Sequence, residues 1–146
     1  MTPRPLDWRL VRAKLRKIEQ LLDALEAMGP VTADGLRNDV TTSLAVERVL
    51  TLVVELAFAV NTHVAVARLG RAPDTYAESF DAVAEAGVVD RDLAAALVPS
   101  AKMRDVLVHA YLDVDHEIVA AAMPLALEQY RSYTRQVARW FQELPG

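Results

Sequence analysis

The feature that most constrains this chain is an apolar run over residues 49–66, VLTLVVELAFAVNTHVAV, inside a stretch from 41 to 69 without glycine or proline. About 20 apolar residues are enough to cross a membrane as a helix. Glu55, Asn61 and His63 interrupt this run, and an ionised carboxylate is costly in lipid. The run therefore predicts a helix buried at the centre of a globular domain, with no membrane partner.

Other segments also predict helices, because their apolar residues recur at helical spacing between turn residues. In the first segment Leu10, Leu15, Ile18, Leu22 and Leu25 form an apolar stripe. The helices are expected over residues 7–28, 41–69, 76–85, 93–108 and 115–144, with a polar connector over 31–40.

The prolines predict where helices bend, and the sequence shows no strand pattern. Pro99 lies inside one predicted helix and should kink or restart it, and Pro124 should bend another, since proline removes a backbone donor. No segment alternates apolar and polar residues between turn signals, so no sheet is expected. The predicted fold class is all-α: one domain over residues 1–146, an up-and-down bundle of four main helices plus a short extra helix.

The charge balance limits the classes of partner. A formal net charge of -4 argues against a general nucleic-acid coat, so any RNA contact needs a local basic patch. Arg9, Arg12 and Arg16 share one helical face and are the candidate RNA-binding residues, although an ordinary polar face remains the alternative. Residues 131, 135 and 139 form a second arginine ladder that is expected to face solvent.

The chain contains no cysteine, which excludes disulfides and thiolate metal sites and fits a reducing compartment. The first sixteen residues are rich in basic side chains and do not resemble a secretory signal. A cytoplasmic location is therefore expected.

The segment RDVLVHAY, residues 104–111, carries the chemistry. Arg104 has a permanent charge and a planar fork of donors suited to phosphate oxygens, and His109 can exchange protons near neutral pH. Asp105 lies four residues before His109, so its carboxylate could orient the imidazole. Residues 106–108 are expected to point inward and anchor the segment. Such a pair suits RNA cleavage without a metal.

The spacing of Arg104 and His109 raises a geometric problem. Five residues correspond to a rotation of about 140° on a helix with 3.6 residues per turn, so the two side chains diverge. Either the helix ends before His109, or a second subunit supplies part of the site.

The pattern Arg-x-x-x-x-His-x-Tyr, followed by Asp113 and Asp115, resembles the signature of the HEPN superfamily. Together with AVERVL in the central helix, it resembles the HepT-like branch of that superfamily. The resemblance implies a homodimer with no cofactor, acting as a metal-independent endoribonuclease toxin on RNA. It also implies a cognate minimal nucleotidyltransferase as the antitoxin.

The resemblance also implies roles for individual residues. Arg104 would neutralise the scissile phosphate, His109 would act as general acid or base, and Asp105 would accompany them as a catalytic residue. Tyr111 would be the tyrosine that the antitoxin adenylylates to silence the toxin. Relatives often carry an acidic residue before the histidine of the second helix, where this chain has Asn61.

Each of these residues also has an ordinary structural interpretation. Arg104 and Asp105 could form a solvated helix face, and His109 could be a structural histidine that is hydrogen-bonded to a carbonyl near the helix end. Tyr111 could serve packing alone.

The function and the other histidines also have alternatives. The chain could be a non-catalytic HEPN module that binds a nucleotide or the nucleotidyltransferase partner. His63 is expected to be a hydrogen-bonded core histidine, with a lesser chance of lining the cleft. His116 follows two aspartates, but the set is too loose for a metal site, and helix capping by Asp115 explains part of it.

Overall fold

The computed structural model describes residues 5–109 and 113–145, so Tyr111 lies outside the described residues. Within these ranges the chain forms helices and no strands. The helices are α1 (Trp8–Ala27), α2 (Ala33–Asn38), α3 (Val40–Leu69), α4 (Tyr76–Glu85), α5 (Arg91–His109) and α6 (His116–Gln142).

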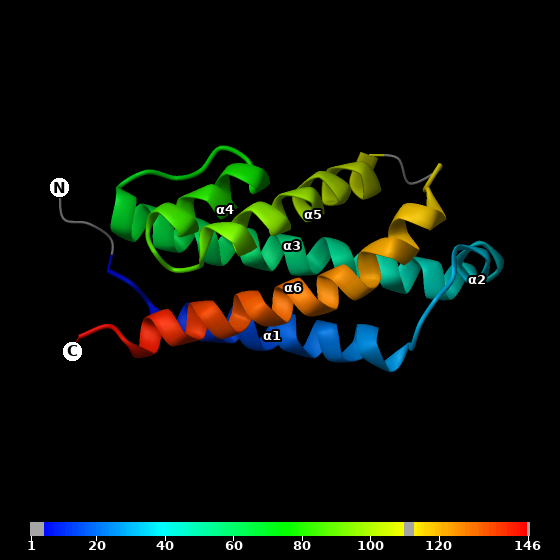
Figure 1. Cartoon of the computed structure of the whole chain (residues 1–146), viewed down its shortest axis with the longest axis horizontal. Helices are drawn as coiled ribbons and strands as arrows, with labels where there is room; N and C mark the ends of the chain where they lie inside the picture. The colour runs from blue at the N-terminus through cyan, green and yellow to red at the C-terminus, as the bar shows by residue number, and fades with distance from the viewer. Residues whose placement is uncertain (1–4, 110–112, 146) are drawn as a thin grey trace.

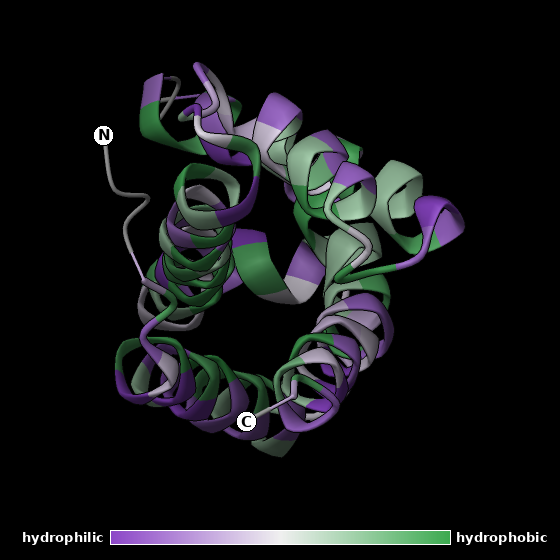
Figure 2. Ribbon diagram, turned by 90° about the vertical axis from the view of Figure 1, so that its left-hand side faces the viewer, coloured by the Kyte–Doolittle hydropathy of each residue, from purple (hydrophilic) through white to green (hydrophobic). Residues whose placement is uncertain are grey.

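Four long helices, α1, α3, α5 and α6, surround one axis, and successive members run in opposite directions (Figure 1). Seen end-on, hydrophobic segments recur on their inner sides (Figure 2). The short α4 packs on α3 and α5. Among the described residues α1 contacts α3 and α6 but not α5, so α1 and α5 are diagonal to one another. The predicted all-α, up-and-down bundle is confirmed.

The apolar run forms the core of the bundle, as its composition predicts. α3 is long and apolar enough to cross a membrane, yet 61% of its most apolar window is buried inside the bundle. Its side chains pack against Ile18 and Leu22 of α1 and Tyr133 of α6, among other fully buried residues. Burial against protein explains the hydrophobicity of α3, so its length and composition are weak evidence for a membrane span.

Side-chain caps set where the helices begin. The carboxylates of Asp7, Asp39 and Asp115 accept hydrogen bonds from the backbone N–H groups of the first turns of α1, α3 and α6. Asp115 therefore acts as the predicted cap. α3 ends at Gly70, whose φ of 72° lies in the left-handed region that favours glycine.

Two local expectations are wrong. The first concerns the connector over 31–40, which contains α2, because Thr32 caps this helix and Leu36 is buried. At Pro99, where a kink or a restart was expected, α5 does not restart, since buried Leu97 and Ala101 hold it on both sides of the proline.

The second wrong expectation concerns the stripe on α1. Leu10 is 42% exposed, whereas its neighbour Val11 is fully buried. Val11 is four residues before Leu15 and seven before Ile18, so it lies on the core face of the helix.

Candidate active site

Arg104 lies between three other side chains at the junction of α3, α4 and α5. Its Nη2 donates to Oε1 of Glu55 at 3.1 Å, and its Nη1 donates to Oδ1 of Asp105 at 3.2 Å. Its Cζ lies 4.6 Å from the centre of the Tyr76 ring, a cation–π distance. With only 18% of its side chain exposed, the guanidinium is held in place rather than free in solvent.

These partners come from elements that the core fixes. Glu55 is on α3 between buried Val54 and Ala57, and Tyr76 is the first residue of α4. The Tyr76 ring packs edge-on against Phe58 at 4.5 Å between centroids. The position of Arg104 is therefore set by two helices besides its own.

The balance of burial and hydrogen bonding keeps Arg104 charged. Burial on its own lowers the pKa of the guanidinium, because it penalises the charged form. Hydrogen bonds to Glu55 and Asp105 outweigh that effect, and the pKa of Arg104 lies above its ordinary value. The site thus holds a permanent cation in a half-buried position.

His109 is the last residue of α5, and its side chain is exposed. Its Nδ1 lies 2.7 Å from the backbone carbonyl oxygen of Asp105. A carbonyl can only accept, so Nδ1 is the donor and the neutral ring carries its lone pair on Nε2. The expectation that the Asp105 carboxylate orients the imidazole is wrong: the backbone carbonyl of Asp105 does so, while its carboxylate contacts Arg104.

Arg104 and His109 diverge within one protomer. α5 remains helical through His109, so the alternative in which the helix ends before this residue is wrong. Arg104 turns towards α3 and α4, whereas His109 lies on the exposed side of α5. Residues 106–108 were expected to point inward, but only Leu107 is buried. Val106 is 55% exposed and Val108 is 41% exposed.

Sequence reasoning missed the role of Glu55 as the partner of Arg104. It treated this residue only as an interruption of the apolar run. A single carboxylate in an otherwise apolar helix requires a partner, and that signal was available in the sequence. The motif therefore does have an acidic contact from α3, made by Glu55, which lies two turns before His63.

Asn61 and His63 serve the core. The amide of Asn61 accepts from the hydroxyl of Tyr133 and donates to the hydroxyl of Ser79. Nε2 of His63 accepts from the backbone N–H of Asp7 at 2.8 Å. The interpretation of His63 as a hydrogen-bonded core histidine is confirmed.

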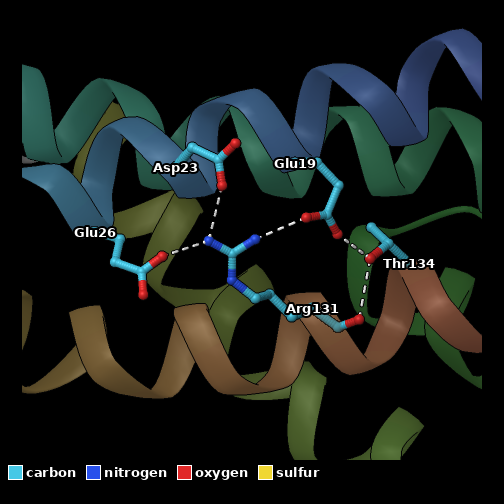
Figure 3. A network of polar contacts seen from close by, with 5 residues as sticks. All are labelled: Glu19, Asp23, Glu26, Arg131 and Thr134. Carbon is cyan, nitrogen blue, oxygen red and sulfur yellow. Dashed lines mark hydrogen bonds and ion pairs between the residues drawn. The ribbon is translucent and has the colours of Figure 1, made fainter.

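The arginines of α1 and α6 lie apart from the motif. Arg9, Arg12 and Arg16 are exposed on α1, the helix diagonal to α5. Arg131 does not face solvent as expected, because it binds three carboxylates of α1, those of residues 19, 23 and 26 (Figure 3). Arg135 is exposed, as expected.

Within residues 5–109 and 113–145, no group of three or more histidine or acidic side chains is arranged to hold a metal ion. That the protein needs neither metal nor cofactor stays a prediction.

The antiparallel helical bundle and the Arg–His motif at the end of α5 agree with the expected resemblance to the HEPN superfamily. The sequence profile of the ribonuclease HepT-like family matches residues 11–137, and the chain belongs to this family.

Individual relatives agree with this assignment. The tRNA nuclease HepT of Aphanizomenon flos-aquae (strain 2012/KM1/D3) is 29% identical over 128 residues, which cover 88% of this chain and 87% of that protein. Two solved structures share the fold. One is the tri-AMPylated HEPN toxin of Shewanella oneidensis in complex with MNT antitoxin (TM-score 0.79, 17% identity, covering 89% of this chain and 97% of that one). The other is YutE of Bacillus subtilis, a cytosolic protein of unknown function (TM-score 0.81, 16% identity, 94% and 92% covered).

Proposed function

We propose that this protein is a metal-independent endoribonuclease, the toxin of a toxin–antitoxin pair, and that Arg104 and His109 carry the reaction. The observation that carries the proposal is the pairing on one helix of a fixed, half-buried cation with an exposed imidazole. Family membership supports the same activity.

The contacts of Arg104 and His109 suit cleavage of an RNA phosphodiester. The ribose 2′-oxygen attacks phosphorus, the bond from phosphorus to the 5′-oxygen breaks, and a 2′,3′-cyclic phosphate and a 5′-hydroxyl result. The two Nη nitrogens of Arg104 carry four N–H donors and use two, while Nε is buried, so two Nη donors can meet the charge that builds on the phosphate. Nε2 of His109 removes the 2′-OH proton or supplies one to the 5′-oxygen. Asp105 contacts both residues and holds them in position.

A homodimer would complete the site. The two reactive side chains diverge on one α5, so a second protomer is needed to bring an arginine and a histidine together. Val106 and Val108 are exposed beside them, and a groove between α3, α5 and α6 is lined by Met103, Ile118 and Leu125. Exposed apolar side chains at this end of the bundle fit an interface between two copies of the chain.

Tyr111 is the proposed point of control. It lies two residues after His109, so adenylyl groups on its hydroxyl would bring phosphate and bulk close to the imidazole. The fold is shared with a tri-AMPylated toxin bound to its MNT antitoxin, which supports a minimal nucleotidyltransferase as the partner. Mixing the protein with that partner and ATP should add adenylyl mass to the wild type and none to Tyr111→Phe. Equal mass gain in both proteins would exclude Tyr111.

Transfer RNA is the substrate class to test first, because a relative is a tRNA nuclease. Arg9, Arg12 and Arg16 remain the proposed RNA contacts of α1. Both tRNA and the antitoxin would be met in the cytoplasm.

One observation favours the alternative, a non-catalytic module that binds a nucleotide or the antitoxin. Arg104 already contacts two carboxylates, so the local charge is negative before any phosphate arrives. Expression in cells separates the two functions. Wild-type protein should slow growth and fragment RNA, and His109→Ala should do neither. If the histidine variant is equally toxic, the catalytic assignment is wrong.

A further inference from the structure

A groove runs between the N-terminal half of α1 and the C-terminal half of α6, which we call the α1–α6 groove. Arg12 and Arg16 line one wall, Arg135 lines the other, and Trp8 lies at the start of α1. All three arginines are exposed. The groove lies near the end of the bundle where α1 begins and α6 ends (Figure 1).

The charge of this groove is not neutralised by the protein. Among the described residues no carboxylate lies within ion-pair distance of Arg12, Arg16 or Arg135. Glu19 is the acidic residue in the lining, and both of its carboxylate oxygens are engaged, by Arg131 and by the hydroxyl of Thr134 (Figure 3). Three cations therefore face the groove without an ion-pair partner, and the one carboxylate in the lining is engaged by Arg131 and Thr134.

The next turns of the same helix pair are different. Arg131 lies one turn before Arg135 on α6, yet it is bound by Glu19, Asp23 and Glu26. The seam between α1 and α6 is thus acidic beside Arg131 and basic beside Arg135. A polyanion would be attracted to one part of the seam and repelled by the other.

Phosphates are the ligand that this arrangement fits. Guanidinium groups bind phosphate oxygens through two parallel N–H donors, and the net charge of -4 means that the basic groove is a local feature. The groove also contains the aromatic ring of Trp8. This ring stacks on Phe141, with 5.0 Å between the centroids, and the contact holds it in place. Arginines beside an aromatic ring are typical of nucleic-acid-binding surfaces.

The groove is remote from the motif. The C-terminal end of α5 and the first turn of α6 lie at the opposite end of the bundle (Figure 1). From His116 to Arg135, α6 rises by about 28 Å at 1.5 Å per residue. A ligand that occupies both places must therefore be a long or folded polyanion.

We infer that the α1–α6 groove is an exosite that binds the RNA backbone away from the bond to be cut. This inference rests on the proposed ribonuclease function and adds to it: substrates should be selected by size as well as by the sequence at the cleavage site.

The test compares two substrates and two variants. Arg12→Ala/Arg135→Ala removes one cation from each wall, and Lys14→Ala/Lys17→Ala removes two cations from the same turns of α1 that do not line the groove. For tRNA we expect the groove variant to have a KM roughly tenfold higher than that of the wild type, with unchanged kcat. The slope of log KM against the logarithm of the salt concentration should fall by roughly 1.4 to 1.8, because two cations are removed. Cleavage of a tetranucleotide should be unchanged, and the lysine control should match wild type on both substrates.

Several outcomes would overturn the exosite. The tRNA KM and salt dependence of the groove variant could equal those of the lysine control, or its cleavage of both substrates could fall together. The variant could also keep its tRNA KM and lose only binding to the nucleotidyltransferase, which would assign the groove to a protein partner.

If the wild type cuts neither RNA, the proposed ribonuclease function fails, but the exosite is still measurable. Fluorescence anisotropy with labelled tRNA then reports binding directly, and the groove variant should bind more weakly than the lysine control. Equal binding by the two variants would overturn the exosite in that case too.

Discussion

Arg104 and Arg131 are two half-buried arginines that each reach carboxylates on another helix. Arg131 is bound by three carboxylates of α1 and connects α1 to α6 (Figure 3). Arg104 is bound by one carboxylate of α3, by its neighbour Asp105 and by the face of Tyr76. The same residue type thus appears once as a link between two helices and once beside an exposed histidine.

The causes of their pKa shifts differ as well. The pKa of Arg131 is raised chiefly by its hydrogen bond to Asp23, with burial opposing. For Arg104, burial is the largest influence and lowers the pKa, and the hydrogen bonds to Glu55 and Asp105 overcome it. Arg131 donates to three carboxylates, whereas Arg104 donates to two and packs on the ring of Tyr76. The two arginines therefore differ in the number and kind of their partners and not in charge.

The largest effect should come from removing Arg104, the proposed phosphate-binding arginine. Arg104→Ala should lower kcat for RNA cleavage by roughly 10²- to 10³-fold, the usual loss when a donor to developing charge is removed. Arg131→Ala should leave kcat within about twofold at a temperature where both variants are folded. Single-turnover cleavage followed on a gel gives both values. Equal losses in the two variants would mean that Arg104 has no special role.

The reverse contrast is expected for stability. Arg131→Ala leaves three carboxylates of α1 close together without a cation, and should cost about 1 to 2 kcal/mol after allowance for their exposure, or roughly 3 to 8 °C in Tm. Thermal unfolding followed by circular dichroism measures this cost. A Tm within about 1 °C of wild type would show that the three ion pairs do not stabilise the seam.

A smaller effect should follow from changing the partner of each arginine. Glu55→Gln keeps the shape of the side chain but removes its charge, so Arg104 is held less firmly, and kcat should fall by roughly tenfold with KM little changed. Glu55→Asp should recover part of the loss. Glu19→Gln makes the matched change beside Arg131 and should leave kcat unaltered. A loss of activity in Glu19→Gln as large as that in Glu55→Gln would remove the distinction between the two sites.

Much of the fold could be predicted from the sequence, because the pattern of apolar residues and the caps at Asp7 and Asp115 are local signals. Side-chain contacts between helices could not. Leu10 and Val11 are neighbours, and only the packing of α1 decides which of them is buried. Likewise, nothing local distinguishes Arg131, which donates to three carboxylates of α1, from Arg135 on the next turn.

The candidate site likewise has features that local sequence predicts and features that depend on packing between helices. Arg104 and His109 were found through the spacing of a motif, and the divergence of their side chains followed from helical rotation. Glu55 was not found, since its pairing with Arg104 joins residues 49 positions apart and depends on how α3 and α5 pack. The contact of His109 with a carbonyl instead of a carboxylate also depends on geometry that residue types do not specify.

The most direct test of the central claim is cleavage of tRNA by purified protein in the presence of a chelator, for wild type beside His109→Ala. We expect the wild type to cut with EDTA present and the histidine variant to be slower by roughly 10²- to 10⁴-fold, the usual contribution of a general acid or base. Equal rates for the two proteins, or wild-type cleavage that appears only when a divalent metal is added, would contradict the claim.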